Sequence, residues 1–327
     1  MPNGEQVKNG KAFEYAIAKE YKEYLEEKGI PARFEEDAAF KTARSFFKEF
    51  DERQQYKYAL SARATIKTLI KLEPGLNSPK NDNDILSIKI AADGRGEEGD
   101  VRDVLFSRST SHWEVGFSAK NNNDAVKHSR LSHILDFGQE WLGYPVSDAY
   151  WDGIRPVFDK LKDYKREKKK WSEIENVHEE IYLPILNCFR DELMRIYSAH
   201  EDVPEKLISY LLGREPFYKI IKDDNSSTVI VKAINIGSGL NKTVNGTKPQ
   251  YRTAKLNYPT RIIEFTMKIN RDKTISKTTL NMILDEGWEI SFRLHSAETY
   301  VIPSLKFDVQ LLGNPPVLFT QYIFQDK

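Results

Sequence analysis

The sequence predicts an α/β (α+β) fold, in which helices flank a mixed central sheet and a largely antiparallel β region follows. Apolar residues recur at three- and four-residue steps near the amino terminus, which is typical of helices. The short runs 85–90, 101–107 and 113–120 are rich in branched and aromatic residues and are bounded by turn residues, as strands are. After residue 216, strand-like runs separated by turn residues continue to the end of the chain.

This change of character suggests two regions. Residues 1–215 should contain the helices and a mixed sheet, and residues 216–327 should form a β-rich region packed on it. A chain of 327 residues is long enough to bury one large core or two smaller ones.

The first predicted helix spans residues 10–28, and one apolar stripe supports it. That stripe consists of Phe13, Ile17, Tyr21, Tyr24 and Leu25. Glu14 lies beside the stripe and, on the helix alone, reads as a solvated carboxylate. Residues 38–71 also follow a helical pattern, which the turn at Glu73–Gly75 ends.

The strands 101–107 and 113–120 are joined by the turn RSTSH and should form a hairpin. From about Asp124, a plausible N-cap, the apolar residues Val126, Leu131, Ile134 and Leu135 predict a further helix.

Composition bounds the function only weakly. Lys+Arg and Asp+Glu are equal at 49 each, so any surface for nucleic acid must be a local concentration of basic groups. No signal-like segment and no run of about 18 apolar residues occurs, which predicts a soluble intracellular protein without a membrane partner. The single cysteine, Cys188, lies in an apolar run and is expected to pack in the interior.

Strand alternation divides the second strand of the hairpin into two faces. One face is apolar and should be core: Trp113, Val115, Phe117 and Ala119. The other is polar and ends in a lysine: Glu114, Gly116, Ser118 and Lys120.

On the first strand, Asp100 and Asp103 are three residues apart and therefore point to opposite faces of a regular strand. If Asp103 shares the face of Lys120, Val104 and Phe106 join Phe117 in the core. Burial therefore favours Asp103, although a bulge near Gly99 would also bring Asp100 close.

A carboxylate and a lysine on neighbouring strands suit metal-assisted hydrolysis of a phosphodiester. Magnesium takes hard oxygen ligands and uses only one or two protein carboxylates. A lysine beside the phosphate stabilises the charge that develops in the transition state. This spacing is common, however, and by itself favours an ordinary structural hairpin.

Longer strings carry a resemblance. The run GDVRDVLF, followed by WEVGFSAKNNNDAVKHSRLSHILDFGQEW, resembles the HaeIII family of type II restriction endonucleases within the PD-(D/E)xK nuclease superfamily. The likeness extends to NGKAFEYA, YLLGREPFYKII and WEISFRLHSAETYVIPSLKFDVQLLG, and so covers most of the chain. It implies a PD-(D/E)xK-like sheet, Mg²⁺ as cofactor and double-stranded DNA as substrate, cut at GGCC to leave blunt ends. It also implies a prokaryotic cytoplasmic enzyme paired with a DNA methyltransferase, and a symmetric site makes a homodimer the simplest assembly.

Carried over residue by residue, the resemblance makes Asp103 the first acid and Lys120 the motif lysine. Ser118 stands where the second acid is usual, and a hydroxyl brings no negative charge to a metal. Glu14, in GKAFE, is the carboxylate expected to complete the site, with Asp100 as a further metal candidate. The substitution at Ser118 keeps one alternative open, a DNA-binding protein of the same fold that has lost catalysis.

The expected contacts to DNA follow the hairpin and recur on a late strand. They are Asn121, Asn122, Asn123, Lys127, His128, Arg130, Arg293 and His295. Basic and amide side chains of this kind suit phosphates and the edges of G·C pairs. For Arg293 and His295 an ordinary surface position is about equally consistent with the pattern. The β-rich region 216–327 is thus expected to take part in DNA binding.

Overall fold

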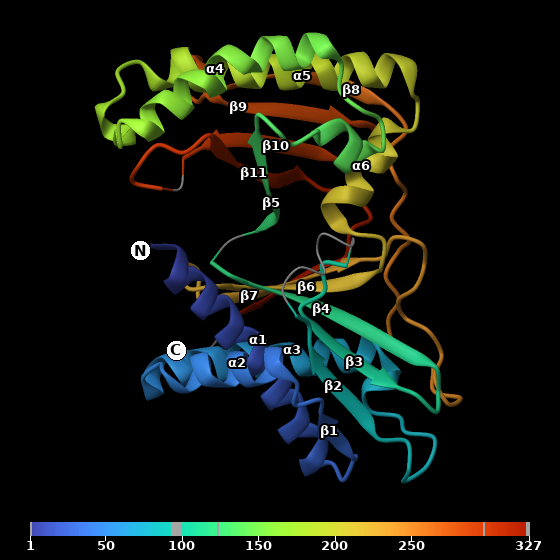
Figure 1. Ribbon diagram of the computed structural model, residues 1–327. Coiled ribbons are helices and arrows are strands. Elements are labelled where there is room, and N and C mark those ends of the chain that lie inside the picture. Colours follow the sequence, from blue (N-terminus) through green and yellow to red (C-terminus); the bar gives the residue numbers. More distant parts are fainter. Residues whose placement is uncertain (1, 93–99, 123, 297, 325–327) are drawn as a thin grey trace. The chain divides into compact units, whose positions relative to one another are not determined.

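The computed structural model describes residues 2–92, 100–122, 124–296 and 298–324 (Figure 1). The chain divides into two compact units, and each unit is built from segments that are distant in sequence. The first comprises residues 1–124, 213–256 and 317–327, and the second comprises residues 125–212 and 257–316.

A seven-stranded mixed sheet forms the centre of the first unit, in the order β1-β2-β3-β4-β6-β7-β12. Strands β1 and β2 are parallel, as are β4 and β6, and the other neighbours are antiparallel. The strands are β1 (Ala32–Phe34), β2 (Leu86–Ile90), β3 (Val104–Arg108), β4 (Trp113–Asn121), β6 (Phe217–Asp223), β7 (Thr228–Ile234) and β12 (Thr320–Phe324).

Three helices accompany this sheet: α1 (Pro2–Glu27), α2 (Ala38–Lys48) and α3 (Glu52–Leu72), with the 3-10 turn η1 (Pro74–Leu76) after them (Figure 1). The buried ring of Tyr21 on α1 lies 5.1 Å from Phe106 and 5.5 Å from Phe117, centroid to centroid. Helix α1 therefore packs on the apolar face of the hairpin β3–β4, because aromatic rings at these distances interlock as a core does.

The second unit holds a five-stranded antiparallel sheet in the order β5-β11-β10-β9-β8. Its strands are β5 (Ala125–Ser132), β8 (Ile262–Ile269), β9 (Ile275–Leu284), β10 (Glu289–His295) and β11 (Ser304–Gly313). Its helices are α4 (Asp148–Arg166), α5 (Leu183–Ala199) and α6 (Val203–Leu212), with short helical turns η2 (Gly138–Leu142), η3 (Trp171–Glu173), η4 (His178–Tyr182) and η5 (Asp285–Gly287).

Helices α4 and α5 run alongside one face of this sheet (Figure 1). The buried ring of Phe189 on α5 lies 4.9 Å from Phe307 of β11 and 5.6 Å from Phe292 of β10. A Cβ atom on Gly153 of α4 would lie 2.8 Å from the Sγ of Cys188 on α5, so glycine permits the close approach of the two helices. Cys188 is half-buried in this contact.

Most of the predicted elements are confirmed. The helix expected over 10–28 lies within α1, and the hairpin strands are β3 and β4. The segment expected to be helical over 38–71 forms two helices, because Asp51 adopts an extended conformation and its side chain accepts the amide of Gln54 as an N-cap.

The helix predicted to start near Asp124 is wrong: residues 125–132 form the strand β5. Its antiparallel partner is β11, in which Leu305 pairs with Leu131 and Ser304 with Ser132. The partner strand lies more than 170 residues away in the sequence, so the apolar spacing within residues 124–135 could not indicate this pairing.

The two units also divide the chain differently from the boundary expected at residue 215. Strands β6, β7 and β12 complete the sheet of the hairpin, whereas β8–β11 pair with β5 in the second sheet. None of the described helices is long and apolar enough to cross a membrane.

Candidate active site

Asp103 lies immediately before β3 and is fixed by its own backbone. Its N–H donates to the carbonyl of Phe117 at 2.8 Å, and its carbonyl accepts the amide of Ala91 at 2.8 Å. Because Val104 pairs with Phe117, Asp103 stands beside Ser118 across the hairpin. The first acid is thus anchored on both sides by sheet hydrogen bonds.

The Asp103 carboxylate gathers three donors from β4. Its Oδ2 accepts the Ser118 hydroxyl at 3.1 Å and the Ala119 amide at 2.8 Å, and the Lys120 ammonium lies 3.5 Å away. Ser118 is 2% exposed, whereas the side chain of Lys120 is 27% exposed. The Asp103 carboxylate is therefore held in place by Ser118 and Ala119, and the Lys120 ammonium beside it is partly open to solvent.

The face alternation predicted for β4 is observed. Trp113, Val115, Phe117 and Ala119 are buried in the core that includes α1, and Asp103 shares the opposite side with Ser118 and Lys120. The parity argument for Asp103 over Asp100 therefore agrees with the geometry.

Glu14 projects from α1 and is 5% exposed. Burial, and after it the negative charge of Asp103, raise the pKa of Glu14 to about 8, so the two carboxylates lie within electrostatic range. The Lys11 ammonium, 3.0 Å from its Oε2, and Lys120 act in the opposite direction. A cation would stabilise the ionised forms of this pair, in which Glu14 is buried and the Asp103 side chain is 24% exposed.

This donor set fits a divalent cation with hard oxygen ligands. Glu14 and Asp103 supply two carboxylates, which is the number that Mg²⁺ ordinarily takes from a protein. Across residues 2–92, 100–122, 124–296 and 298–324, no cluster of three or more His, Cys, Asp or Glu side chains forms a metal site. Ser118 adds only a neutral hydroxyl, which donates to Asp103.

Asp100, the other predicted metal candidate, is engaged elsewhere. Its two carboxylate oxygens accept the Arg102 guanidinium at 2.8 and 2.9 Å, and Arg102 also donates to Glu114 at 2.8 Å. The arginine lies over Gly116, where a Cβ atom would come 2.1 Å from its Cδ. Gly116 thus provides the space in which Arg102 joins Asp100 to Glu114.

The described asparagines at the end of β4, Asn121 and Asn122, are bonded to the end of β6 and the residue after it. Asn122 has a φ of 56°, its amide donates to the Lys222 carbonyl at 2.8 Å, and its side chain exchanges two hydrogen bonds of 2.8 Å with Asp224. The side-chain Oδ1 of Asn121 accepts from the Lys222 ammonium at 3.4 Å. These side chains hold the end of β4 against residues 222–224; Asn123 lies outside the described residues.

The other predicted DNA contacts fall on the second sheet. Arg130 pairs with Lys306 and Lys306 with His295 in one cross-strand row, and Asp308 pairs with Arg293 in the next, while the backbone of His128 pairs with Asp308. Residues in such rows share a sheet face. The adjoining positions Leu294, Leu305 and Phe307 are fully buried, so Arg130, Lys306, His295 and Arg293 belong to the face opposite that core. These four residues occupy two adjacent cross-strand rows on one face, and we call them together the basic row.

Arg293 is exposed and its neighbours in the basic row are partly exposed. The interaction with Asp308, 2.7 Å from Nε2, raises the pKa of His295. Arg130 donates to the Ser304 hydroxyl at 3.2 Å. The backbone of Lys127 pairs with Val309, in the neighbouring register position to His128.

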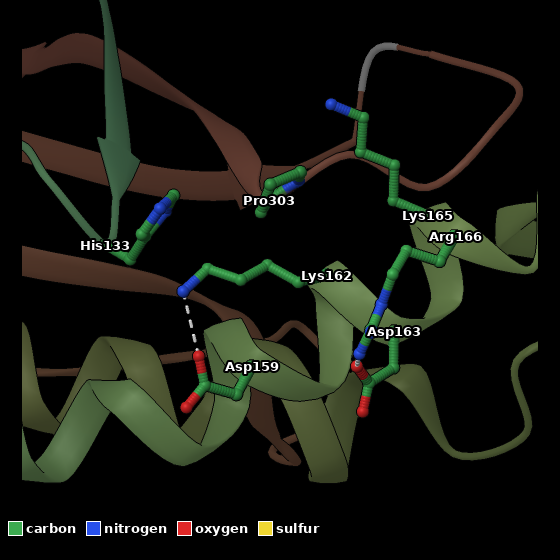
Figure 2. Close-up of a pocket in the computed structure, with 7 residues that line it drawn as sticks. All are labelled: His133, Asp159, Lys162, Asp163, Lys165, Arg166 and Pro303. Atoms are coloured by element: carbon green, nitrogen blue, oxygen red, sulfur yellow. Dashed lines mark hydrogen bonds and ion pairs between the residues drawn. The ribbon is translucent and has the colours of Figure 1, made fainter.

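A cavity of about 710 Å³ lies in the second unit, and none of the hairpin residues lines it. Figure 2 shows His133 and Pro303 opposite the carboxyl-terminal part of α4, with Lys162 bonded to Asp159 and Arg166 to Asp163. Because both acids are paired with cations of the same helix, the lining contains no carboxylate pair like Glu14 and Asp103.

The structure adds residues that the sequence did not suggest. Lys219 of β6 is 3% exposed, pairs in register with Ser118, and shares Asp124 with Lys232 of β7. Lys306 completes the basic row. A lysine inside the apolar strand FYKIIK was the available signal for Lys219, but its partner Asp124 is 95 residues away.

Comparison with known proteins agrees with this geometry. The family model described as HaeIII restriction endonuclease matches residues 10–315. The chain is 39% identical over 311 residues to "Type II restriction enzyme HaeIII" of Haemophilus aegyptius, covering 95% of each chain. No solved structure matches the chain. The chain belongs to the HaeIII restriction endonuclease family. It is a type II restriction endonuclease of that family.

Proposed function

We propose that this chain is a Mg²⁺-dependent endonuclease that hydrolyses phosphodiester bonds in double-stranded DNA at a short palindrome. The observation that carries the proposal is the meeting of Asp103, Ser118 and Lys120 on one hairpin, with Glu14 in electrostatic range. The family membership supports the same reaction, because the matched region contains all four residues.

Asp103 and Glu14 would hold the metal, which when bound would activate water and neutralise charge on the leaving oxygen. Lys120 is the residue proposed to stabilise the charge that develops on the phosphate. Its ammonium lies 3.5 Å from the Asp103 carboxylate and so stands next to the proposed metal position. Ser118 and the Ala119 amide keep the Asp103 carboxylate in one orientation.

The basic row is the surface proposed to hold DNA. Arg130, Lys306 and Arg293 project from three adjacent strands of one sheet and would contact phosphates or guanine edges. The rigid ladder supports this role, since a sheet fixes the spacing between its side chains. Asn121 and Asn122 would then act by fastening the catalytic strand rather than by contacting bases, because both are bonded to β6.

The recognition sequence proposed is GGCC, cut at its centre to leave blunt ends, as the resemblance to the HaeIII family implies. A palindrome is most simply read by a two-fold dimer, and a methyltransferase that protects the same site would be its functional partner.

The proposal is tested by incubating the protein with plasmid DNA, with and without Mg²⁺, and sequencing the ends of the products. Discrete blunt fragments that end at GG and CC, formed only with metal, are expected. Fragments with another terminal sequence would replace the proposed site, and fragments formed equally in a chelator would contradict the metal requirement.

One observation favours a second function, a catalytically inactive DNA-binding protein: Ser118 contributes no charge to the site. That function predicts salt-dependent affinity for DNA without cleavage at any metal concentration. The plasmid experiment, repeated with a binding assay, separates the two.

A further inference from the structure

Two buried lysines lie beside the Asp103 site on the same sheet. Ser118 of β4 pairs with Lys219 of β6, which pairs with Lys232 of β7. Since Asp103 stands on the other side of Ser118, one row across the sheet carries an acid, a serine and two lysines. The two lysines therefore lie next to the proposed active site, in the same row of the sheet.

Asp124 joins the two lysines to the chain that leaves β4. The Lys219 ammonium donates to the Asp124 carbonyl at 2.8 Å and forms an ion pair with its carboxylate, while Lys232 lies 2.5 Å from the other carboxylate oxygen. We call Lys219, Asp124 and Lys232 the clamp. Within the clamp, the two lysines hold the backbone and side chain of Asp124, which is only four positions after Lys120.

The clamp is built at an energetic cost. Burial lowers the pKa of Lys219 to about 8, although Asp124 opposes this change. Burial raises the pKa of Asp124, but the two lysines hold it below its ordinary value. Replacing buried charges by apolar side chains of similar volume often leaves a fold as stable or more stable, so stability alone does not account for the two buried lysines.

We propose that the clamp positions the end of β4, and with it Lys120, for phosphodiester cleavage; this rests on the proposed function. Lys219 and Lys120 are close enough for their charges to repel, which favours the orientation of Lys120 toward Asp103. Lys219 is a positioning residue, because its ammonium is buried and bound to Asp124.

The segment after β4 is bonded to the first sheet in two places, and the clamp is the one on the face of Ser118. Asn122 is bonded to Lys222 and Asp224 at the end of the strand, whereas Lys219 acts on the face of Ser118. Loss of the clamp should therefore loosen residues 119–122 while leaving the core face of β4 intact.

The test compares Lys219→Met with a triple variant, Lys219→Met, Asp124→Leu and Lys232→Met, which removes the clamp without leaving a buried charge unpaired. Two quantities are measured: amide exchange of residues 119–122, and the single-turnover cleavage rate at saturating DNA and Mg²⁺. Both variants should exchange faster at these amides and cleave about 100-fold more slowly, since misplacement by about 1 Å has effects of that size.

Arg108→Met is the matched control. Arg108 is a fully buried cation at the far end of the same hairpin, and it donates to the carbonyls of Gly75 and Leu76. It pairs with Trp113, five residues before Ser118, or about 17 Å by strand rise. This variant should lower the melting temperature yet leave exchange at 119–122 and the saturated rate within about twofold of wild type.

A folded triple variant that cleaves at the wild-type rate overturns the proposal, as does a slower variant whose exchange at 119–122 is unchanged. If the wild type does not cleave DNA, the proposed function fails. The exchange measurement still decides the clamp in that case: faster exchange in both variants supports positioning, and unchanged exchange overturns it.

Discussion

The two sheets of this protein use charge in opposite ways. In the first, Ser118, Lys219 and Lys232 are buried, and the partly exposed carboxylates of Asp103 and Asp124 are each held by several donors of the same sheet. In the second, the basic row is exposed or partly exposed along an antiparallel ladder. Buried charges with fixed partners suit a reaction that needs preorganised groups, whereas exposed cations suit the binding of a hydrated polyanion.

The contrast predicts a division of labour between the sheets. Changes in the first should alter the rate of cleavage at saturating DNA, and changes in the basic row should alter affinity and its dependence on salt. The substitutions below, taken from the largest expected effect to the smallest, test that division.

Asp103→Asn should lower the single-turnover rate by about 1,000-fold or more, because it removes a carboxylate proposed to bind metal. The affinity for DNA in the absence of metal should not fall. Rates measured at saturating DNA, with binding followed in a chelator, check both parts. Asp100→Asn should have a much smaller effect on the rate, since Asp100 is bonded to Arg102; an equal loss in both variants would contradict the assignment from face parity.

Glu14→Gln should also lose cleavage, and it should stabilise the metal-free protein at pH 8. The folded protein holds the Glu14 proton up to a pKa of about 8, against the ordinary value of 4.5. The native state therefore binds more protons than the unfolded state between these values, and stability falls as pH rises through that window.

Urea unfolding at pH 5 and pH 8 measures this effect. The variant should gain about 2 kcal/mol or more over wild type at pH 8 and show little difference at pH 5, given 1.36 kcal/mol for each pKa unit. A variant with the same pH dependence as wild type would show that Glu14 is not the group responsible.

Arg293→Ala should have the smallest effect, about a tenfold loss of affinity or less, with a shallower dependence of log K on log salt. The slope should fall by about one unit if the side chain contacts a phosphate. Arg53→Ala, at an exposed position on α3, is the matched control and should leave the slope unchanged. An Arg293 variant that binds as wild type at every salt concentration would remove it from the DNA surface.

The sequence predicted the hairpin correctly because its two strands are neighbours in the chain and pair with each other. Period-two alternation separated Phe117 from Ser118, and the apolar neighbours Val104 and Phe106 selected Asp103. The same reasoning failed for β5, whose partner β11 comes far later in the chain. A segment with mixed spacing takes its structure from the ladder it joins.

The clamp was hidden for a related reason. Lys219 can be buried because Asp124 forms an ion pair with it. Neither residue indicates this pairing in the sequence, because the two are far apart in the chain. Asn121 and Asn122 were expected to contact DNA because they directly follow the predicted site, yet their side chains bond to Lys222 and Asp224. Sequence patterns identified the hairpin that brings Asp103 and Lys120 together, whereas the tertiary partners decided which nearby polar residues support it.

The most direct test measures Asp103→Asn and Arg293→Ala in one assay, with the saturated cleavage rate and the dissociation constant determined for each. The aspartate variant should lose about 1,000-fold or more in rate with unchanged affinity, and the arginine variant should lose affinity with a near-normal saturated rate. An Asp103 variant that cleaves at the wild-type rate, or an Arg293 variant that loses rate but not affinity, would contradict the separation of chemistry and DNA binding between the two sheets.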